Sequence, residues 1–235
     1  MTYFSFPEYT PNNLSCWMKI VQHDLHIANH RRSCSTIVIE HDKNFSKTNI
    51  LLYNLTMQYK RLFIENSYVF ITIVTAKRRK ILLENIQILR EAFKRTIQSF
   101  NYEIYAICIL PEHIHIIIKP YDINDYPKII QQIKRYFSQK IDKQNIDNYS
   151  LTSGNVRRKE CDIWQHRYWE HTIRDINDLY KHLDYIHYNP IKHGYTNKAK
   201  DWEFSSFNKF VKQHFYELDW CNFDNINKIN ELNYE

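Results

Sequence analysis

Glycine is nearly absent from this chain. Among its 235 residues there are two glycines, Gly154 and Gly194. A phosphate-binding loop of the Walker or dinucleotide type needs several glycines close together, because the backbone must approach the phosphates closely. The sequence therefore excludes an enzyme that holds ATP or NAD through such a loop.

Paired cysteines and long apolar runs are also lacking. The five cysteines are odd in number, widely spaced and without a CxxC pair, which favours free thiols in a reducing compartment over disulfides or a zinc knuckle. The longest apolar runs, such as residues 114–118, are too short to span a bilayer. Residues 1–11 do not resemble a secretory signal. We therefore expect a cytoplasmic protein with no membrane partner.

Positive charge and aromatic side chains are abundant instead. The formal net charge is +6, and 15% of the residues are aromatic, including 18 tyrosines. This charge favours an anionic partner, and flat aromatic faces suit stacking on unpaired bases. The tyrosine content also fits a gene from an AT-rich genome, in which case it carries no functional information.

The spacing of apolar residues predicts the secondary structure from residue 59 onward. It indicates strands at 67–75, 102–110, 113–119 and 162–174, and helices at 82–100, 126–141 and 176–188. The short link between the second and third strands favours an antiparallel hairpin. This order predicts an α+β fold, with a mainly antiparallel sheet and helices packed on it.

Local signals add detail to this scheme. Asp125 and Asp175 are predicted N-caps, and Pro190 with Gly194 is predicted to end the last helix. Residues 145–159 predict a mobile basic loop, and residues 202–207 a short helical or irregular cover. Residues 35–40 could form a strand, and residues 49–57 a helix or strand, within an N-terminal segment that carries no motif.

The most informative strand contains two histidines. His113 and His115 are two residues apart, so they project from the same face, while Ile114, Ile116 and Ile118 face the other side and can enter a core. Two imidazoles on one rigid face can hold a divalent metal ion. The alternative is a half-buried strand with two surface histidines, and the strand alone does not decide between them.

The last predicted helix carries a tyrosine away from its apolar stripe. Asp178, His182, Tyr185 and Asn189 recur at intervals of three and four, so they share a second face. A tyrosine on this face beside Asn189 could direct its hydroxyl to a ligand. It could equally bridge core and solvent, as tyrosine often does. His182 could relay a proton from Tyr185, although a surface histidine is the simpler interpretation.

Four motifs together resemble a known family. They are LPEHIHIIIKP at 110–120, WQHRYWEHTIRD at 164–175, LDYIHYNPIKHG at 183–194 and DWEFSSF at 201–207. In order and spacing the chain is similar to the REP-associated tyrosine transposases, relatives of the single-tyrosine HUH transposases of insertion sequences. The resemblance covers residues 57–212. It implies an HUH core of ferredoxin-like or RRM-like type, with residues 1–56 as an extension of unknown role and 213–235 as a tail.

The resemblance also implies a chemistry. His113, His115 and the amide oxygen of Asn189 would hold Mg²⁺ or Mn²⁺, and Tyr185 would attack a phosphodiester of single-stranded DNA beside a hairpin, forming a 5′-phosphotyrosine. A metal ion would assist, because a phenol with a pKa near 10 is a weak nucleophile. Glu112 is not assigned to the metal, since a regular strand directs it away from His113. The protein would associate with the bacterial nucleoid.

Basic side chains are the predicted contacts to the DNA backbone. They are Lys77, Arg78, Arg79, Lys80, Arg135, Arg157, Arg158 and Lys192. Trp164 and Tyr168 are candidates for base stacking. Two other functions remain open: a hairpin-DNA binding protein without cleavage, and a metal phosphodiesterase that activates water and does not use Tyr185. The resemblance allows a monomer or a homodimer.

Overall fold

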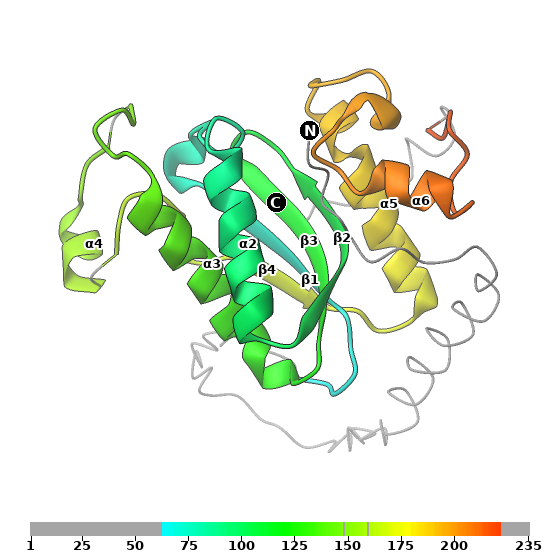
Figure 1. Ribbon diagram of the computed structural model, residues 1–235, viewed down its shortest axis with the longest axis horizontal. Coiled ribbons are helices and arrows are strands. Elements are labelled where there is room, and N and C mark those ends of the chain that lie inside the picture. The colour runs from blue at the N-terminus through cyan, green and yellow to red at the C-terminus, as the bar shows by residue number, and fades with distance from the viewer. Residues whose placement is uncertain (1–62, 148, 159, 222–235) are drawn as a thin grey trace, which may run out of the picture.

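The computed structural model describes residues 63–147, 149–158 and 160–221 (Figure 1). The predicted N-terminal extension, with its possible elements at 35–40 and 49–57, lies outside these residues, as does Lys159. In the described part, Cys108, Cys161 and Cys221 are free thiols, as expected. No described helix is both long and apolar enough to cross a membrane.

The described residues form a four-stranded antiparallel sheet. Its strands are β1 (Val69–Val74), β2 (Tyr102–Ile109), β3 (His113–Pro120) and β4 (Trp169–Thr172), in the order β2-β3-β1-β4. The predicted β2–β3 hairpin is confirmed. Helix α2 (Ile86–Ser99) connects β1 to β2, and α3 (Tyr126–Lys140) follows β3. This β-α-β-β-α-β order is ferredoxin-like, which confirms the predicted α+β fold.

One face of the sheet is covered by α2 and α3 (Figure 1). Ile114, Ile116 and Ile118 of β3 project to this side and are fully buried with apolar residues of both helices, among them Leu89 and Ile133. The alternation predicted for β3 is therefore confirmed. Burial of these branched side chains supplies a large part of the free energy that holds the helices on the sheet.

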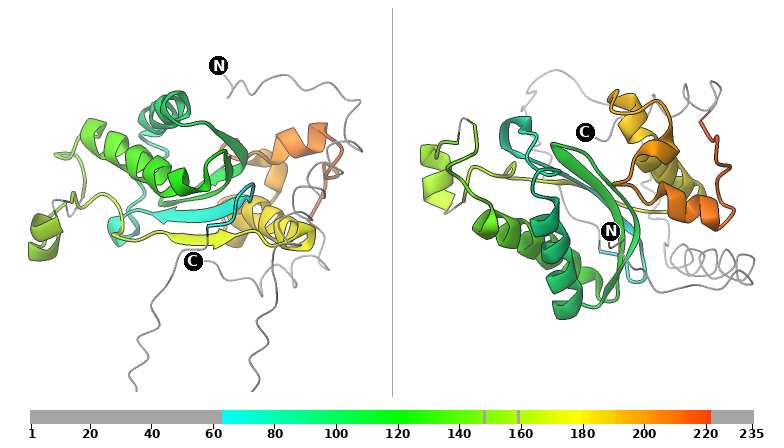
Figure 2. Two further views of the ribbon diagram at one scale, coloured as in Figure 1. Left: turned by 90° about the horizontal axis from the view of Figure 1, so that it is seen from below. Right: turned by 45° about the horizontal axis from the view of Figure 1, so that its top comes forward.

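The opposite face is covered by α5 (Ile176–Lys192) and α6 (Phe207–Lys212). Figure 2 shows these helices on the far side of the sheet from α2 and α3. Phe70 and Ile117 project from the sheet into a second core with Leu183, Ile186 and Phe207. The side chains at 113 and 115 face this second layer, because they alternate with the isoleucines of the first.

Helix α5 begins as the sequence predicts and ends later. The carboxylate of Asp175 accepts a hydrogen bond from the backbone N–H of Asp178 at 2.9 Å, which confirms the N-cap. The prediction that Pro190 helps end the helix is wrong, since Pro190 lies inside it and the helix runs to Lys192. A proline so near the end removes only one of the helix's last hydrogen bonds. Gly194 does follow the helix, with φ of +71°.

The connection between α3 and β4 differs from its prediction. Residues 145–159 were expected to form a loop, but Ser153–Arg158 forms the short helix α4. Its start is fixed by reciprocal bonds: the hydroxyl of Thr152 accepts from the N–H of Asn155 at 3.1 Å, and Oδ1 of Asn155 accepts from the N–H of Thr152 at 3.1 Å. This reciprocal cap stabilises a turn that has no apolar periodicity to predict it.

The predicted fourth strand at 162–174 is too long. Only Trp169–Thr172 pairs with β1, apart from one isolated bridge between Trp164 and Thr75. The indole of Trp164 packs on Phe137 with ring centroids 5.2 Å apart, and its N–H donates to the carbonyl of Lys134. Burial of this indole against α3 takes the segment out of the sheet, although its sequence alternates like a strand.

Two further local predictions have mixed outcomes. Asp125 occupies the N-cap position of α3, but its carboxylate accepts from Lys128 Nζ instead of a backbone N–H. Asp122 caps the short 3₁₀ helix Ile123–Asp125 that precedes it. Residues 202–207, predicted to cover the sheet or a groove, lie along the edge of the sheet at β2. The carbonyl of Phe204 accepts from the N–H of Ile109 at 2.8 Å.

Candidate active site

The register of β3 on β1 brings both histidines beneath α5. His115 lies opposite Thr72, and His113 lies opposite Val74. The two imidazole rings are 4.7 Å apart between centroids, and both side chains are fully buried. The interpretation of the pair as surface histidines is therefore wrong.

Each imidazole is oriented through its Nδ1 atom. Nδ1 of His113 is 3.1 Å from Oε1 of Glu112, and Nδ1 of His115 is 2.9 Å from the hydroxyl of Thr72. A carboxylate can only accept, so Nδ1 of His113 carries a proton, and in the neutral ring Nε2 then carries the lone pair. The hydroxyl of Thr72 can hold the ring of His115 in the same way. Such partners of a metal-binding imidazole fix both ring orientation and tautomer.

Glu112 is itself held as an anion. Burial alone would raise the pKa of this carboxyl, but hydrogen bonds from His113 and from the hydroxyl of Tyr195, at 2.8 Å, outweigh burial and lower the pKa below its ordinary value. The expectation that Glu112 points away from His113 is wrong. Glu112 immediately precedes the first residue of β3, so regular strand alternation does not constrain its direction.

Helix α5 contributes Asn189 to the same place. Its Oδ1 lies 3.2 Å from Nε2 of His113, and the residue is fully buried. In the neutral ring with its proton on Nδ1, the lone pairs of Nε2 and Oδ1 face each other, and the amide Nδ2 has no hydrogen-bond partner among the described residues. A cation between Oδ1 and Nε2 would relieve that repulsion. Two imidazoles and an amide oxygen therefore suit a divalent ion here.

Tyr185 lies one turn before Asn189 on the same side of α5. Its ring contacts the ring of His115 edge to face, with centroids 5.1 Å apart, and Phe70 flanks it at 6.1 Å. The side chain is fully buried, so the interpretation that it bridges core and solvent is wrong. The ammonium of Lys192 lies 5.1 Å from the centre of the ring. One chain thus brings together Tyr185, Asn189 and both histidines.

The basic residues predicted to contact DNA have different surroundings. Six of them have exposed side chains: Lys77, Arg78, Lys80, Arg135, Arg157 and Arg158. Arg79 is partly buried, and its side chain bonds to Asp162, which Lys77 also contacts at 3.1 Å. Lys80 lies 5.5 Å above the ring of Tyr195, whose hydroxyl donates to Glu112. Lys80 is therefore at the border of the histidine site.

The stacking candidates and His182 are less exposed than expected. Trp164 is buried against α3, so it cannot stack on a base, and Tyr168 packs partly on the first core. His182 is fully buried, so its interpretation as a surface histidine is wrong. Its ring lies against Phe70, with centroids 4.8 Å apart.

Sequence reasoning missed the groups that orient the site. Glu112 and Tyr195 hold one imidazole and Thr72 holds the other. Only Glu112 carried a signal, as a carboxylate directly beside a predicted ligand. Thr72 and Tyr195 are distant in sequence from the histidines, and only the fold brings them to the site.

Comparison with known proteins identifies the family. The sequence profile of the IS200-like transposases matches residues 63–189. A protein named as a REP-associated tyrosine transposase from Haemophilus influenzae is 41% identical over 164 residues, covering 69% of this chain and 92% of the relative. A REP-associated tyrosine transposase of Escherichia coli is 33% identical over 166 residues, covering 70% of this chain and 90% of the relative.

A solved structure agrees with these relatives. The structure of a REP-associated tyrosine transposase bound to a REP hairpin is 31% identical in sequence, with a TM-score of 0.58. The match covers 70% of this chain and 91% of the other. The sequence profile, the named relatives and the solved structure all indicate a transposase. The chain belongs to the IS200-like transposase family and, within it, to the REP-associated tyrosine transposases.

Proposed function

We propose that this chain is a metal-dependent single-strand DNA endonuclease and strand transferase that acts beside a hairpin. The observation that carries the proposal is the meeting of Nε2 of His113 and Oδ1 of Asn189 at 3.2 Å, with the ring of Tyr185 against His115. The proposed nucleophile, the proposed ligands and a nearby cation come from two turns of one helix and from one strand.

His113, His115 and Asn189 would hold Mg²⁺ or Mn²⁺. When bound, the ion would neutralise charge on the non-bridging oxygens of the scissile phosphate and orient its phosphorus. Three protein ligands of mixed nitrogen and oxygen type leave further positions for phosphate oxygens and give modest, exchangeable binding. Glu112 and Thr72 would keep the two rings in the orientation that presents Nε2.

Tyr185 would act as the nucleophile. Its phenolic oxygen attacks phosphorus, a new O–P bond forms, and the bond from phosphorus to the 3′ oxygen breaks. The tyrosine keeps the 5′ phosphate, the released 3′ oxygen takes up a proton, and the phenolic proton leaves. Since the phosphotyrosine conserves the energy of the broken bond, the reverse attack by a 3′ hydroxyl rejoins DNA without ATP. The ammonium of Lys192 lies 5.1 Å from the ring centre and would place a positive charge beside the negative charge that develops in this reaction.

The substrate proposed is single-stranded DNA next to a REP-like hairpin. The solved relative was bound to such a hairpin. The exposed cations Lys77, Arg78 and Lys80 lie in the segment just after β1, and Arg157 and Arg158 lie on α4. Their contacts with phosphates would contribute affinity without reading sequence. Because all four residues of the candidate site come from one chain, a monomer contains the complete set.

The test is covalent capture. A labelled single strand carrying a hairpin is incubated with the full chain and Mg²⁺ or Mn²⁺, and protein–DNA adducts are resolved on a denaturing gel. The wild type should form an adduct that Tyr185→Phe does not form, while both bind the DNA. Tyr188→Phe, a buried tyrosine on the same helix, is the matched control and should keep the adduct.

Two results would contradict the proposal. If the wild type binds the hairpin but never forms an adduct with either ion, the protein is a binding module. If Tyr185→Phe still cleaves the strand, the reaction uses water and the tyrosine is not the nucleophile.

A further inference from the structure

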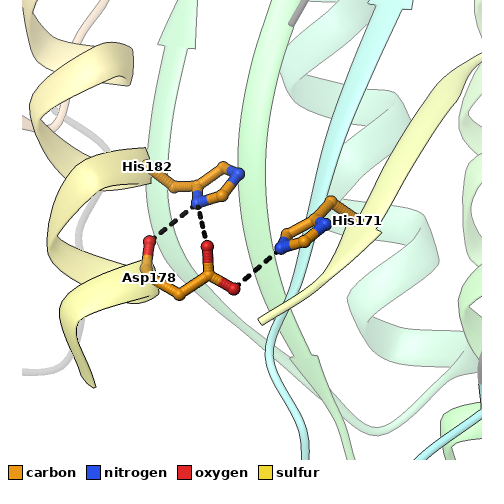
Figure 3. A group of neighbouring side chains, drawn as sticks. All are labelled: His171, Asp178 and His182. Carbon is orange, nitrogen blue, oxygen red and sulfur yellow. Dashed lines mark hydrogen bonds and ion pairs between the residues drawn. The ribbon is translucent and has the colours of Figure 1, made fainter. Parts of the chain in front are cut away.

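A second group of metal-ligating side chains lies outside the candidate active site. His171 on β4 and Asp178 and His182 on α5 lie together, with both imidazoles bonded to Asp178 (Figure 3), and one possible ligand atom from each lies within 4.8 Å of the other two. None of the three belongs to the proposed ligand set around His113. We propose that this trio is a binding site for a divalent transition-metal ion of the zinc class.

The trio comes from two neighbouring elements. Asp178 and His182 are four residues apart on α5, so both project from one face of the helix toward the sheet. His171 comes from β4, where it lies opposite Phe70 of β1. Asp178 and His182 are buried, and His171 is partly exposed.

The carboxylate of Asp178 lies between the two imidazoles. Oδ2 is 2.8 Å from Nε2 of His171, and Oδ1 is 3.3 Å from Nδ1 of His182. The backbone N–H of Arg174 also donates to Oδ2, at 2.9 Å, which holds the carboxylate in place. Nδ1 of His182 in addition lies 2.7 Å from the backbone oxygen of Asp178. An ion would replace the protons on Nε2 and Nδ1, and each neutral ring would then carry its proton on the other nitrogen.

Aromatic rings flank both imidazoles. The rings of His171 and His182 are nearly parallel, 4.7 Å apart, and Trp169 stacks on the other side of His171 at 5.9 Å. Phe70 packs on His182 at 4.8 Å and on His115 at 5.8 Å. The ring of Phe70 thus stands between this trio and the histidine pair, which makes them two separate sites.

The donor set selects the class of ion. Two imidazole nitrogens and one carboxylate oxygen are a zinc-type set of three protein ligands, which leaves a fourth position of a tetrahedron for water. His171 is partly exposed, so solvent reaches that position. Mg²⁺ prefers oxygen ligands and octahedral geometry, so it suits this trio poorly. An ion here would tie β4 to the first turns of α5, ahead of Tyr185.

The test is a cobalt titration of the full chain after removal of metals by a chelator. Four-coordinate Co²⁺ absorbs strongly in the visible range, whereas octahedral Co²⁺ absorbs weakly. We expect the wild type to show strong bands from one Co²⁺ per chain, lost on addition of Zn²⁺ and unaffected by Mg²⁺. Saturating Zn²⁺ should raise the melting temperature by at least about 5 °C.

Three variants locate the ion. His171→Gln should abolish the bands and the rise in melting temperature; glutamine can still donate to Asp178, so the metal-free fold is kept. The double variant His113→Ala, His115→Ala should keep the bands, which makes the result independent of the proposed active site. His166→Ala, an exposed histidine in the segment before β4, is the matched control.

The proposal is overturned by either of two results. One is the absence of strong bands in the wild type. The other is bands that persist in His171→Gln or disappear in the double variant, which would assign the ion to the histidine pair beside Tyr185.

Discussion

His187 makes a sharp prediction about the dependence of stability on pH. This residue of α5 is fully buried among the rings of Phe207, Phe210 and Tyr216, with centroids 5.0 to 5.7 Å away. Burial lowers the pKa of its imidazole from 6.5 to about 3. The folded protein therefore keeps this ring neutral at pH values where an unfolded chain protonates it.

Its hydrogen bonds explain why protonation is unfavourable. The hydroxyl of Ser206 donates to the carbonyl of Ile107, so it accepts from Nε2–H of His187 at 2.9 Å. Nδ1, the atom that would take up the second proton, has no hydrogen-bond partner among the described residues. A proton there would create a buried charge without an acceptor, which is costly.

The magnitude follows from linkage. Because the pKa of His187 is lowered in the folded state, its contribution to the free energy of unfolding is complete above the ordinary pKa of 6.5. This contribution is lost as the pH falls from 6.5 toward 3. A pH of 5 is about 1.5 below the ordinary pKa, and each pH unit corresponds to about 1.4 kcal/mol. Protonation of His187 in the unfolded chain therefore lowers the free energy of unfolding by about 2 kcal/mol between pH 7 and pH 5. This figure holds for any folded-state pKa well below 5.

The assay is urea unfolding at pH 7, 6 and 5, followed by tryptophan fluorescence. Other groups also titrate, so the measured quantity is a difference between variants. His187→Gln, whose amide can still donate to Ser206, should lose about 2 kcal/mol less than the wild type over this range. His214→Asn, at an exposed position, should behave like the wild type. Equal losses in wild type and His187→Gln would refute the reasoning.

Three further predictions concern the candidate active site. Thr72→Val removes the hydrogen-bond partner of His115 Nδ1. We expect the Mn²⁺ concentration needed for adduct formation to rise by about 10- to 100-fold. The control Thr172→Val, on β4, should leave this concentration unchanged. Lys192→Met removes the cation beside Tyr185. It should slow adduct formation at saturating DNA by at least about tenfold in single-turnover measurements. An unchanged rate would show that Lys192 contributes to DNA binding alone. Lys80→Met should reduce the slope of log affinity against log salt by about 1 and leave the single-turnover rate intact, and an unchanged slope would exclude a phosphate contact.

Much of the site could be predicted because it depends on local periodicity. Strand alternation places His113 and His115 on one face of β3, and helical spacing places His182, Tyr185 and Asn189 on one face of α5. Periodicity does not show whether the polar face of α5 points to solvent or to the core. Both the apolar stripe and the polar face of α5 are buried, so a rule that turns polar faces toward solvent fails for His182.

Tertiary packing overrides a local pattern in two of the following cases, whereas the case of Pro190 has a local cause. Trp164 sits in an alternating segment, yet burial of its indole against α3 removes it from the sheet. Pro190 is tolerated in α5 because the helix ends two residues later. Thr72 became a partner of His115 through the β1–β3 register, which no local pattern in either strand encodes.

The polarity of the covalent link tests the central claim most directly. A hairpin strand is labelled either upstream or downstream of the cleavage site, and the adduct is digested and its modified peptide sequenced by mass spectrometry. The account predicts that only the downstream label, attached through its 5′ phosphate, stays with the protein, and that the modified residue is Tyr185. An upstream label on the protein, or a DNA adduct on any other residue, would contradict it.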